Sequence, residues 1–361
     1  MYECRACGRT YEETAAAPWR CDCGHALDFV DLALPGDGPP TSPDRDRGLW
    51  TFASALPAGR RVSLGEGWTP LVDAPGWNAT FTLEYLFPTG SFKDRGAAVT
   101  LSHAAALGVD RVLEDSSGNA GAAIATYAAR AGIDAEIYVP ADVKAAKLRA
   151  IERTGADVVR IEGDREAVTD ACTEAVAEGG WYASHAWNPA FFAGTATFAF
   201  EVAAQRGWTA PDAVVTPLGH GTLFLGAYRG FRLLLEAGWI DRLPRLYGAQ
   251  AAGIAPIVAD RHGKAAAAGA AGANTAADGI QIAEPARRDQ ILVAIEETGG
   301  NAVAVDEATT ERHLGRLHRA GFYTEPTCAV APAALAALRE AGEVDDEEDV
   351  VVPLTGSGLK T

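Results

Sequence analysis

Lysine is almost absent from this sequence. Of the 361 residues only five are lysines, and arginine supplies nearly all of the 31 basic side chains. Acidic residues number 48, so the formal net charge is −17 at pH 7. A surface of this charge repels nucleic acid and anionic membranes, which we therefore exclude as partners. The acidic, lysine-poor composition indicates a halophilic protein, since added acidic charge aids solubility in concentrated salt.

Long apolar runs are also lacking. The first residues, MYECRACGRTYEE, have no apolar stretch behind a basic segment and are not typical of a signal peptide. No apolar run long enough to span a membrane occurs without glycine, proline or charge. We therefore expect a cytoplasmic protein. The length and the 48% of hydrophobic residues predict two compact domains plus an appendage.

Cysteine is scarce, and most of it lies near the start of the chain. Cys4 and Cys7 are separated by two residues, and Cys21 and Cys23 by one. Each pair can lie on one tight turn and direct both thiolates at a single tetrahedral Zn²⁺, as in a zinc ribbon. His25 could replace one cysteine as a ligand. Four protein ligands make such an ion structural, and the alternative of disulfides is disfavoured without a secretory signal.

From about Trp68 the chain alternates short β-rich runs with longer helical runs. The pattern predicts strands over 111–114, 135–139, 157–161, 213–216 and 350–354, and helices over 97–107, 120–131, 144–153, 165–177, 195–205 and 222–237. This alternation favours parallel sheets covered by helices, an α/β fold. We expect a surface loop or frayed helix over 264–273, a solvated acidic turn over 343–349, and core positions for Cys172 and Cys328.

The strongest chemical signal surrounds one of the five lysines. In the segment PTGSFKDRGA, residues 88–97, a Gly-Ser loop leads into an apolar helix, so Lys93 lies close to a helix N-terminus. The helix dipole and burial both disfavour a protonated amine there. A neutral amine is what Schiff-base chemistry requires. The alternative is an ordinary surface lysine at the start of a helix.

This segment closely resembles the cofactor-lysine motif of the threonine synthase-like, fold type II pyridoxal-phosphate enzymes. Residues 64–71, LGEGWTPL, and the N-terminal cysteines are similar to threonine synthases as well. The resemblance implies that Lys93 carries pyridoxal 5'-phosphate and takes the α-proton. It also implies a homodimer and two α/β domains: a ribbon over 1–30, a linker over 31–49, a large cofactor domain over 50–95 and 186–361, and a small substrate domain over 96–185.

A second motif, SSGNAG over residues 116–121, lies between a predicted strand and a predicted helix. Small residues let backbone amides approach an anion at the helix N-terminus, although such a run is often only a turn. The resemblance implies a role for five of its members. Asn119 would bond to the ring hydroxyl of the cofactor, and the substrate carboxylate would be bound by Ser116, Ser117, Gly118 and Ala120.

Two further motifs are similar to cofactor contacts of the family. The loop Gly219-His220-Gly221-Thr222-Leu223 follows a predicted buried strand and opens a helix, which suits a phosphate cradle. We expect His220 to contribute its backbone. The C-terminal LTGSGLK implies that Thr355, or failing that Ser357, meets the pyridine nitrogen. A hydroxyl there leaves the ring a weaker electron sink than a carboxylate would, which suits elimination and replacement.

The resemblance fails where a substrate phosphate would bind. The family often shows Asn-Ser-x-Asn-Pro-x-Arg, but residues 185–191 read HAWNPAF, which puts Phe191 at the arginine position. Phe87 likewise replaces a common asparagine. Loss of a bidentate arginine is costly, unless Arg95 or His185 binds the phosphate.

Three functions therefore compete. We expect a carbon–oxygen lyase resembling threonine synthase, which converts O-phosphohomoserine to threonine and phosphate. The alternative is a serine/threonine ammonia-lyase or a β-replacement enzyme on a small amino acid. A zinc-ribbon binding module on an inactive scaffold is disfavoured, because Lys93, Asn119, the glycine loop and Thr355 are all intact.

Overall fold

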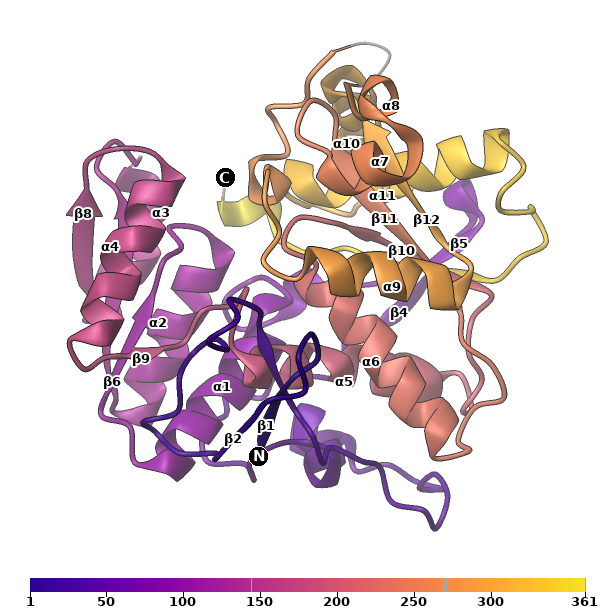
Figure 1. Cartoon of the computed structure of the whole chain (residues 1–361). Helices are drawn as coiled ribbons and strands as arrows, with labels where there is room; N and C mark the ends of the chain where they lie inside the picture. Colours follow the sequence, from indigo (N-terminus) through magenta and orange to yellow (C-terminus); the bar gives the residue numbers. More distant parts are fainter. Residues whose placement is uncertain (144, 269–271, 361) are drawn as a thin grey trace. The chain divides into compact units, whose positions relative to one another are not determined.

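The computed structural model describes residues 1–143, 145–268 and 272–360, and it divides into two compact units (Figure 1). Unit 1 comprises residues 1–34, 44–67 and 93–195, and unit 2 comprises residues 35–43, 68–92 and 196–361. This division differs from the expected one, because residues 1–30, 50–67 and 186–195 all belong to unit 1. The reason for 50–67 is visible in the core, where Leu49, Trp50 and Val62 pack with the apolar residues of unit 1.

Unit 1 contains a four-stranded parallel sheet in the order β8-β7-β6-β9. Its strands are β6 (Arg111–Glu114), β7 (Asp134–Pro140), β8 (Asp157–Ile161) and β9 (Trp181–Tyr182). The helices are α1 (Lys93–Leu107), α2 (Asn119–Ala131), α3 (Ala145–Glu152) and α4 (Arg165–Ala177), with a 3₁₀ segment η1 (Arg45–Ala55).

Alternation along the strands gives this sheet a core on each face. Val112 and Ile137 pack with α1, α2 and α3, whereas the neighbouring Leu113 and Tyr138 pack with Val168 and other residues of α4. Successive strand residues point to opposite faces, so the sheet separates the two sets of helices.

The N-terminal residues form a small antiparallel sheet of unit 1. Its strands are β1 (Tyr2–Cys4), β2 (Thr10–Tyr11) and β3 (Leu27–Phe29), in the order β2-β1-β3. Two contacts fasten it to the rest of the unit. The Tyr2 hydroxyl lies 2.8 Å from Nε2 of His103 in α1, and the Trp19 ring meets the ring of Trp187 edge-on at 4.9 Å.

Unit 2 contains a six-stranded sheet in the order β12-β11-β10-β13-β5-β4, parallel except for the β4–β5 pair. The strands are β4 (Leu71–Ala74), β5 (Ala79–Thr82), β10 (Ala213–Pro217), β11 (Arg245–Ala251), β12 (Asn301–Val305) and β13 (Val350–Pro353). The helices are α5 (Pro189–Gln205, entering from unit 1), α6 (Thr222–Glu236), α7 (Pro256–His262), α8 (Lys264–Ala268), α9 (Arg288–Thr298), α10 (Glu307–Arg319) and α11 (Pro326–Glu340). Four 3₁₀ turns complete it: η2 (Pro75–Trp77), η3 (Glu84–Leu86), η4 (Asp278–Ile280) and η5 (Gly358–Lys360).

The predicted elements are present, with shifted ends. β6, β8 and α4 have the predicted bounds, while α1 begins at Lys93 and α5 at Pro189, before their predicted starts. Part of 264–273 is helical, as α8, and residues 144 and 269–271 lie outside the described residues. Cys172 and Cys328 are both buried, as predicted. In the described part of the chain, no helix is long and apolar enough to cross a membrane.

Candidate active site

The lysine segment begins in unit 2 and continues into unit 1. Gly90 makes the turn with φ of 77°, a conformation that favours glycine. The backbone N–H of Phe92 then donates to the carbonyl of Thr355 at 3.1 Å, and α1 starts at the next residue. Lys93 therefore directly follows a residue that is bonded to the C-terminal motif.

The ring of Phe191 lies beside the side chain of Lys93. Its side chain is fully buried, and its ring centre lies 5.8 Å from Nζ of Lys93. The ring lies so close to Gly96 that a Cβ there would come within 2.1 Å of it. Gly96 therefore leaves room for the Phe191 ring. Phe191 has a packing role here, and it does not make the phosphate contact that an arginine at this position would make.

A carboxylate and an imidazole meet at the end of the unit 1 sheet. Glu114 ends β6 and is fully buried, and its Oε1 lies 2.7 Å from Nδ1 of His185. The other oxygen, Oε2, accepts the backbone N–H of His185 at 3.2 Å. Burial, reinforced by Asp115, raises the pKa of the Glu114 carboxyl, while the Lys93 charge opposes the rise. Sequence reasoning named His185 only in passing and missed Glu114, which looked like an ordinary strand residue.

The loop of residues 115–118 starts directly after Glu114. The N–H of Gly118 donates to Oγ of Ser116 at 3.3 Å, and Gly118 caps α2, which begins at Asn119. Gly121 is required by sterics, because a Cβ there would lie 1.8 Å from the carbonyl oxygen of Ser116. The motif is thus a tight turn at a helix N-terminus, where anions bind.

The glycine loop of unit 2 joins β10 to α6. Gly221 caps α6 with φ of 78°, and a Cβ there would lie 2.7 Å from Cδ1 of Ile291. At Gly219 a Cβ would approach Cα of Ile280 to 3.1 Å. The first turn of a helix leaves N–H groups without intrahelical acceptors. A cradle that side chains would fill, at the positive end of a 15-residue helix, fits a phosphate group.

Thr355 is held by residues that are distant in sequence. Its Oγ1 lies 3.3 Å from Sγ of Cys328, and the same sulfur accepts the N–H of Gly356 at 3.0 Å. Gly356 pairs with Ser91, and Ser357 pairs with Thr324. The C-terminal motif is therefore fixed between the lysine segment and the start of α11. Cys328 was predicted as a core residue only, and the sequence carried no signal of its contact with Thr355.

These residues form two sets, one in each unit. In unit 1 the charge of Lys93 opposes the burial that raises the pKa of Glu114. The same unit carries the loop with Asn119. Unit 2 carries the glycine loop and Thr355.

Residues 62–356 match a family model described as pyridoxal-phosphate dependent enzyme. The chain belongs to this family.

Individual relatives agree with the family. The chain is 33% identical to the threonine synthase of Methanocaldococcus jannaschii, over 100% of this chain and 93% of the relative. It is 33% identical to the threonine synthase of Mycobacterium leprae, over 86% of this chain and 87% of the relative. The chain is thus a pyridoxal-phosphate-dependent lyase resembling threonine synthase.

Solved structures agree in fold. Maize serine racemase matches with a TM-score of 0.68 at 20% identity, over 81% of this chain and 88% of that one. Threonine deaminase isoform 2 from Solanum lycopersicum matches with a TM-score of 0.67 at 21% identity, over 90% of this chain and 87% of that one. At these identities the match concerns the α/β fold alone.

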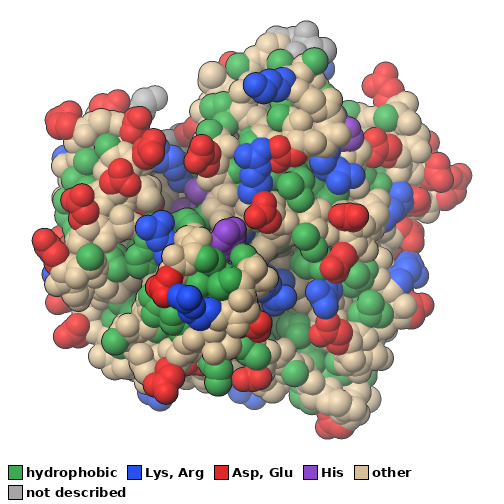
Figure 2. All heavy atoms as spheres, viewed as in Figure 1, with side chains coloured by type: hydrophobic (Ala, Val, Ile, Leu, Met, Phe, Trp, Pro, Cys, Tyr) green, Lys and Arg blue, Asp and Glu red, His purple; other side chains and the backbone are tan. Residues whose placement is uncertain are grey.

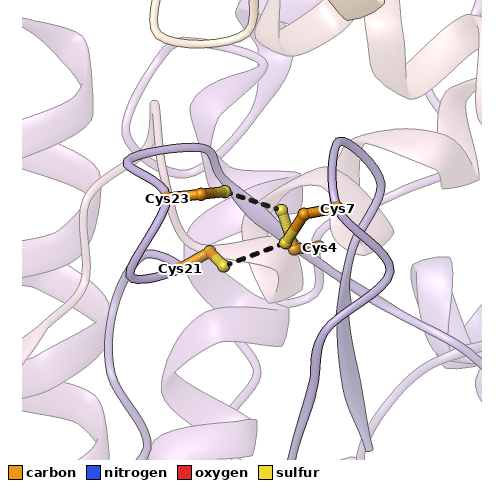
Figure 3. Close-up of side chains that lie close together, drawn as sticks. All are labelled: Cys4, Cys7, Cys21 and Cys23. Carbon is orange, nitrogen blue, oxygen red and sulfur yellow. Dashed lines mark hydrogen bonds between the residues drawn. The ribbon is translucent and has the colours of Figure 1, made fainter.

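The four N-terminal cysteines form a second cluster (Figure 3). Cys4 and Cys7 lie on one loop and face Cys21 and Cys23 on the other, and the four sulfurs lie within 4.8 Å of one another. All four are free thiols. Nδ1 of His25 lies 3.5 Å from Sγ of Cys23. The arrangement can hold one metal ion.

Proposed function

We propose that this enzyme converts O-phosphohomoserine and water to L-threonine and phosphate. The support is the threonine synthase name of relatives that match the chain over nearly its whole length. The single structural observation that carries the proposal is the lysine segment. It fixes Lys93 at the start of α1, directly after the bond from Phe92 to Thr355.

The proposed cofactor contacts are the residues of the motifs that resemble the family. Lys93 carries pyridoxal 5'-phosphate, Asn119 bonds to its ring hydroxyl, and Thr355, or alternatively Ser357, meets its ring nitrogen. The cofactor phosphate lies in the loop Gly219-His220-Gly221-Thr222-Leu223. The substrate carboxylate is bound by Ser116, Ser117, Gly118 and Ala120.

The chain's own residues then move the protons. When bound, the cofactor supplies an electron sink for the charge that develops at the α-carbon. With the cofactor bound, the amine of Lys93 would take the α-proton as a general base. The buried Phe191 ring beside this amine keeps water from one side of it.

A second candidate function is favoured by Phe191 itself. Because this residue is fully buried against Gly96, it supplies no charge for a substrate phosphate. A serine/threonine ammonia-lyase or a β-replacement enzyme would need no such charge.

A parallel assay separates the two functions. Purified enzyme, which should be yellow from its bound cofactor, is given O-phosphohomoserine, threonine or serine. Phosphate release with threonine formation is the expected result. Keto acid from threonine or serine without phosphate release would favour the second function. Lys93→Ala should lose the cofactor absorbance and every activity.

We also propose that Cys4, Cys7, Cys21 and Cys23 bind one structural Zn²⁺. The spacing of the sulfurs and their sequence order support this, and four ligands leave no position for a substrate. Metal analysis should find about one zinc per chain in the wild type and a clear loss in Cys7→Ser. An equal content in both would contradict the proposal. We further propose that the protein is a cytoplasmic homodimer, and sedimentation of the purified protein tests the dimer.

A further inference from the structure

An elimination needs more than a base at the α-carbon. The bond from carbon to the leaving oxygen must also break, and that oxygen leaves more easily if it receives a proton. Lys93 is engaged at the α-carbon. The structure of unit 1 offers one other acid–base pair beside it, Glu114 and His185.

The pair is placed by the parallel sheet. Glu114 ends β6, and β6 pairs with β9 through Leu113 and Tyr182. His185 follows β9 by three residues, so both side chains extend from the carboxyl ends of adjacent parallel strands. Ligands of open α/β sheets bind beyond these ends. The loop proposed for the substrate carboxylate begins at the residue after Glu114.

The imidazole is oriented from two sides. Glu114 contacts both Nδ1 and the backbone N–H of His185, at 2.7 and 3.2 Å, which turns Nε2 away from the carboxylate. The ring of Phe191 meets the imidazole edge-on, with ring centres 6.1 Å apart. The same phenyl ring lies 5.8 Å from Nζ of Lys93. One buried ring thus lies near both the lysine amine and the imidazole.

We propose that His185, oriented by Glu114, is a catalytic acid–base residue that acts on the leaving group while Lys93 acts at the α-carbon. The carbon–oxygen bond breaks, and its electron pair stays on the oxygen. The proton of Nε2 moves to that oxygen, so phosphate leaves protonated or hydroxide leaves as water. Solvent then returns a proton to the imidazole. This role of His185 rests on the proposed function only in one respect: a leaving group must depart from the side chain of the substrate.

The acid role sets the direction of the pH dependence. Charges near Glu114 include Asp115 beside it, Lys93 of α1 and Arg165 of α4. Cys172 and Tyr182 also lie within its electrostatic reach. Because the protonated imidazole is the active form, product formation should fall as the pH rises through the titration of the pair. This fall of product formation with rising pH should be absent in His185→Gln.

Exchange of the α-proton separates the two roles. The holoenzyme is incubated in D₂O with O-phosphohomoserine or with threonine, and proton NMR follows both the Cα–H signal and the product. In His185→Gln we expect exchange within about threefold of the wild type but product formation about 100-fold slower, the usual contribution of a general acid. Glu114→Gln should fall between the two. His313→Gln, which removes a buried imidazole of unit 2, should change neither rate.

Two results would overturn the inference: a parallel fall of exchange and product in His185→Gln, or no change in either. Wild-type enzyme that yields keto acid but no phosphate would reject the proposed substrate alone, and the keto acid then serves as the product. Formation of neither product would reject both. Imidazole ¹⁵N NMR adds a readout independent of turnover. The signal absent from His185→Gln must titrate at a different pH in Glu114→Gln, and an unchanged titration contradicts the pairing.

Discussion

At the scale of single residues, Gly221 offers a sharp test of the proposed phosphate loop. Alanine there must adopt a positive φ, which costs about 1–2 kcal/mol, and its Cβ would lie 2.7 Å from Ile291. We expect Gly221→Ala to raise the cofactor dissociation constant at least about tenfold, measured by fluorescence titration. Gly238 has φ of 70° with open space around a Cβ, so Gly238→Ala should cost stability alone. Equal cofactor affinity in all three proteins would contradict the loop assignment.

Cys328 tests the proposed role of Thr355. Burial raises the pKa of the Cys328 thiol to about 12, so the sulfur keeps its proton at neutral pH. The thiol donates that proton to the carbonyl of Gly356, and the hydroxyl of Thr355 can donate to the sulfur. Loss of one such bond is worth about 1 kcal/mol, or about fivefold in affinity. We expect Cys328→Ala to bind the cofactor about fivefold more weakly, with a shifted absorbance maximum.

Two matched variants complete this test. Cys328→Ser keeps a donor at the same place and should restore the absorbance maximum. Cys172→Ala removes an equally buried cysteine of unit 1 and should leave the spectrum unchanged. A spectrum in Cys328→Ala identical to that of the wild type would show that the thiol does not position Thr355.

The site was predictable to the extent that its chemistry is local in sequence. Lys93 and the glycine loop can each be recognised from neighbours within a few residues of the chain. Glu114 does not, because only the pairing of β6 with β9 brings it to His185. Cys328 reaches Thr355 across 27 residues of chain through pairings that no periodicity encodes.

At the scale of elements, the same contrast governs helix ends. α4 has the bounds predicted from periodicity, and Asp164 caps it in the usual way, accepting the N–H of Ala167. The early start of α5 had a readable signal too. Asn188 accepts the N–H of Ala190, and Pro189 follows at the first helical position. The strand β11 could not be predicted, since RLYGAQA is buried almost throughout and lacks alternation.

The small N-terminal sheet, proposed to be a zinc ribbon, is the element whose purpose the sequence left open. Trp19 lies two residues before Cys21 and meets the rings of Tyr182 and Trp187 edge-on at 5.2 and 4.9 Å. These residues flank His185. Aromatic pairs contribute about 0.5–1.5 kcal/mol each beyond burial. We expect Trp19→Ala to keep its metal but to lower kcat/KM severalfold, measured on the substrate that the wild type uses.

A matched control exists in unit 2. Trp239 meets Trp208 edge-on at 5.0 Å, so Trp239→Ala removes a similar pair and should lower stability without lowering kcat/KM. If both variants behaved alike, the ribbon would have no special influence on the residues around His185.

At the scale of the whole molecule, the chain passes between the two units several times, and one of these crossings is the peptide bond from Phe92 to Lys93. The residue proposed to carry the cofactor is therefore the first residue of a segment of unit 1. On its unit 2 side the chain is held by Thr355, and on its unit 1 side it continues as α1. Backbone pairing next to the lysine thus helps to position it.

The net charge of −17 leads to the last prediction. Figure 2 shows acidic side chains scattered over the face in view, interspersed with basic ones. Such a surplus destabilises the folded state by self-repulsion. Salt shortens the screening length from about 10 Å at 0.1 M to about 3 Å at 1 M. We expect the midpoint of thermal unfolding to rise by several degrees between about 0.1 and 2 M KCl, with the protein still soluble.

Two comparisons show whether repulsion is the cause. Asp345 and Glu347 are exposed in the acidic turn over 343–349. Replacing them by Asn and Gln should raise the midpoint at low salt and reduce the further gain at 2 M, because less repulsion remains to be screened. Sorbitol at matched osmolality, which does not screen charge, should give a smaller gain than KCl. Precipitation in strong salt, or an equal gain in sorbitol, would contradict adaptation of this surface to salt.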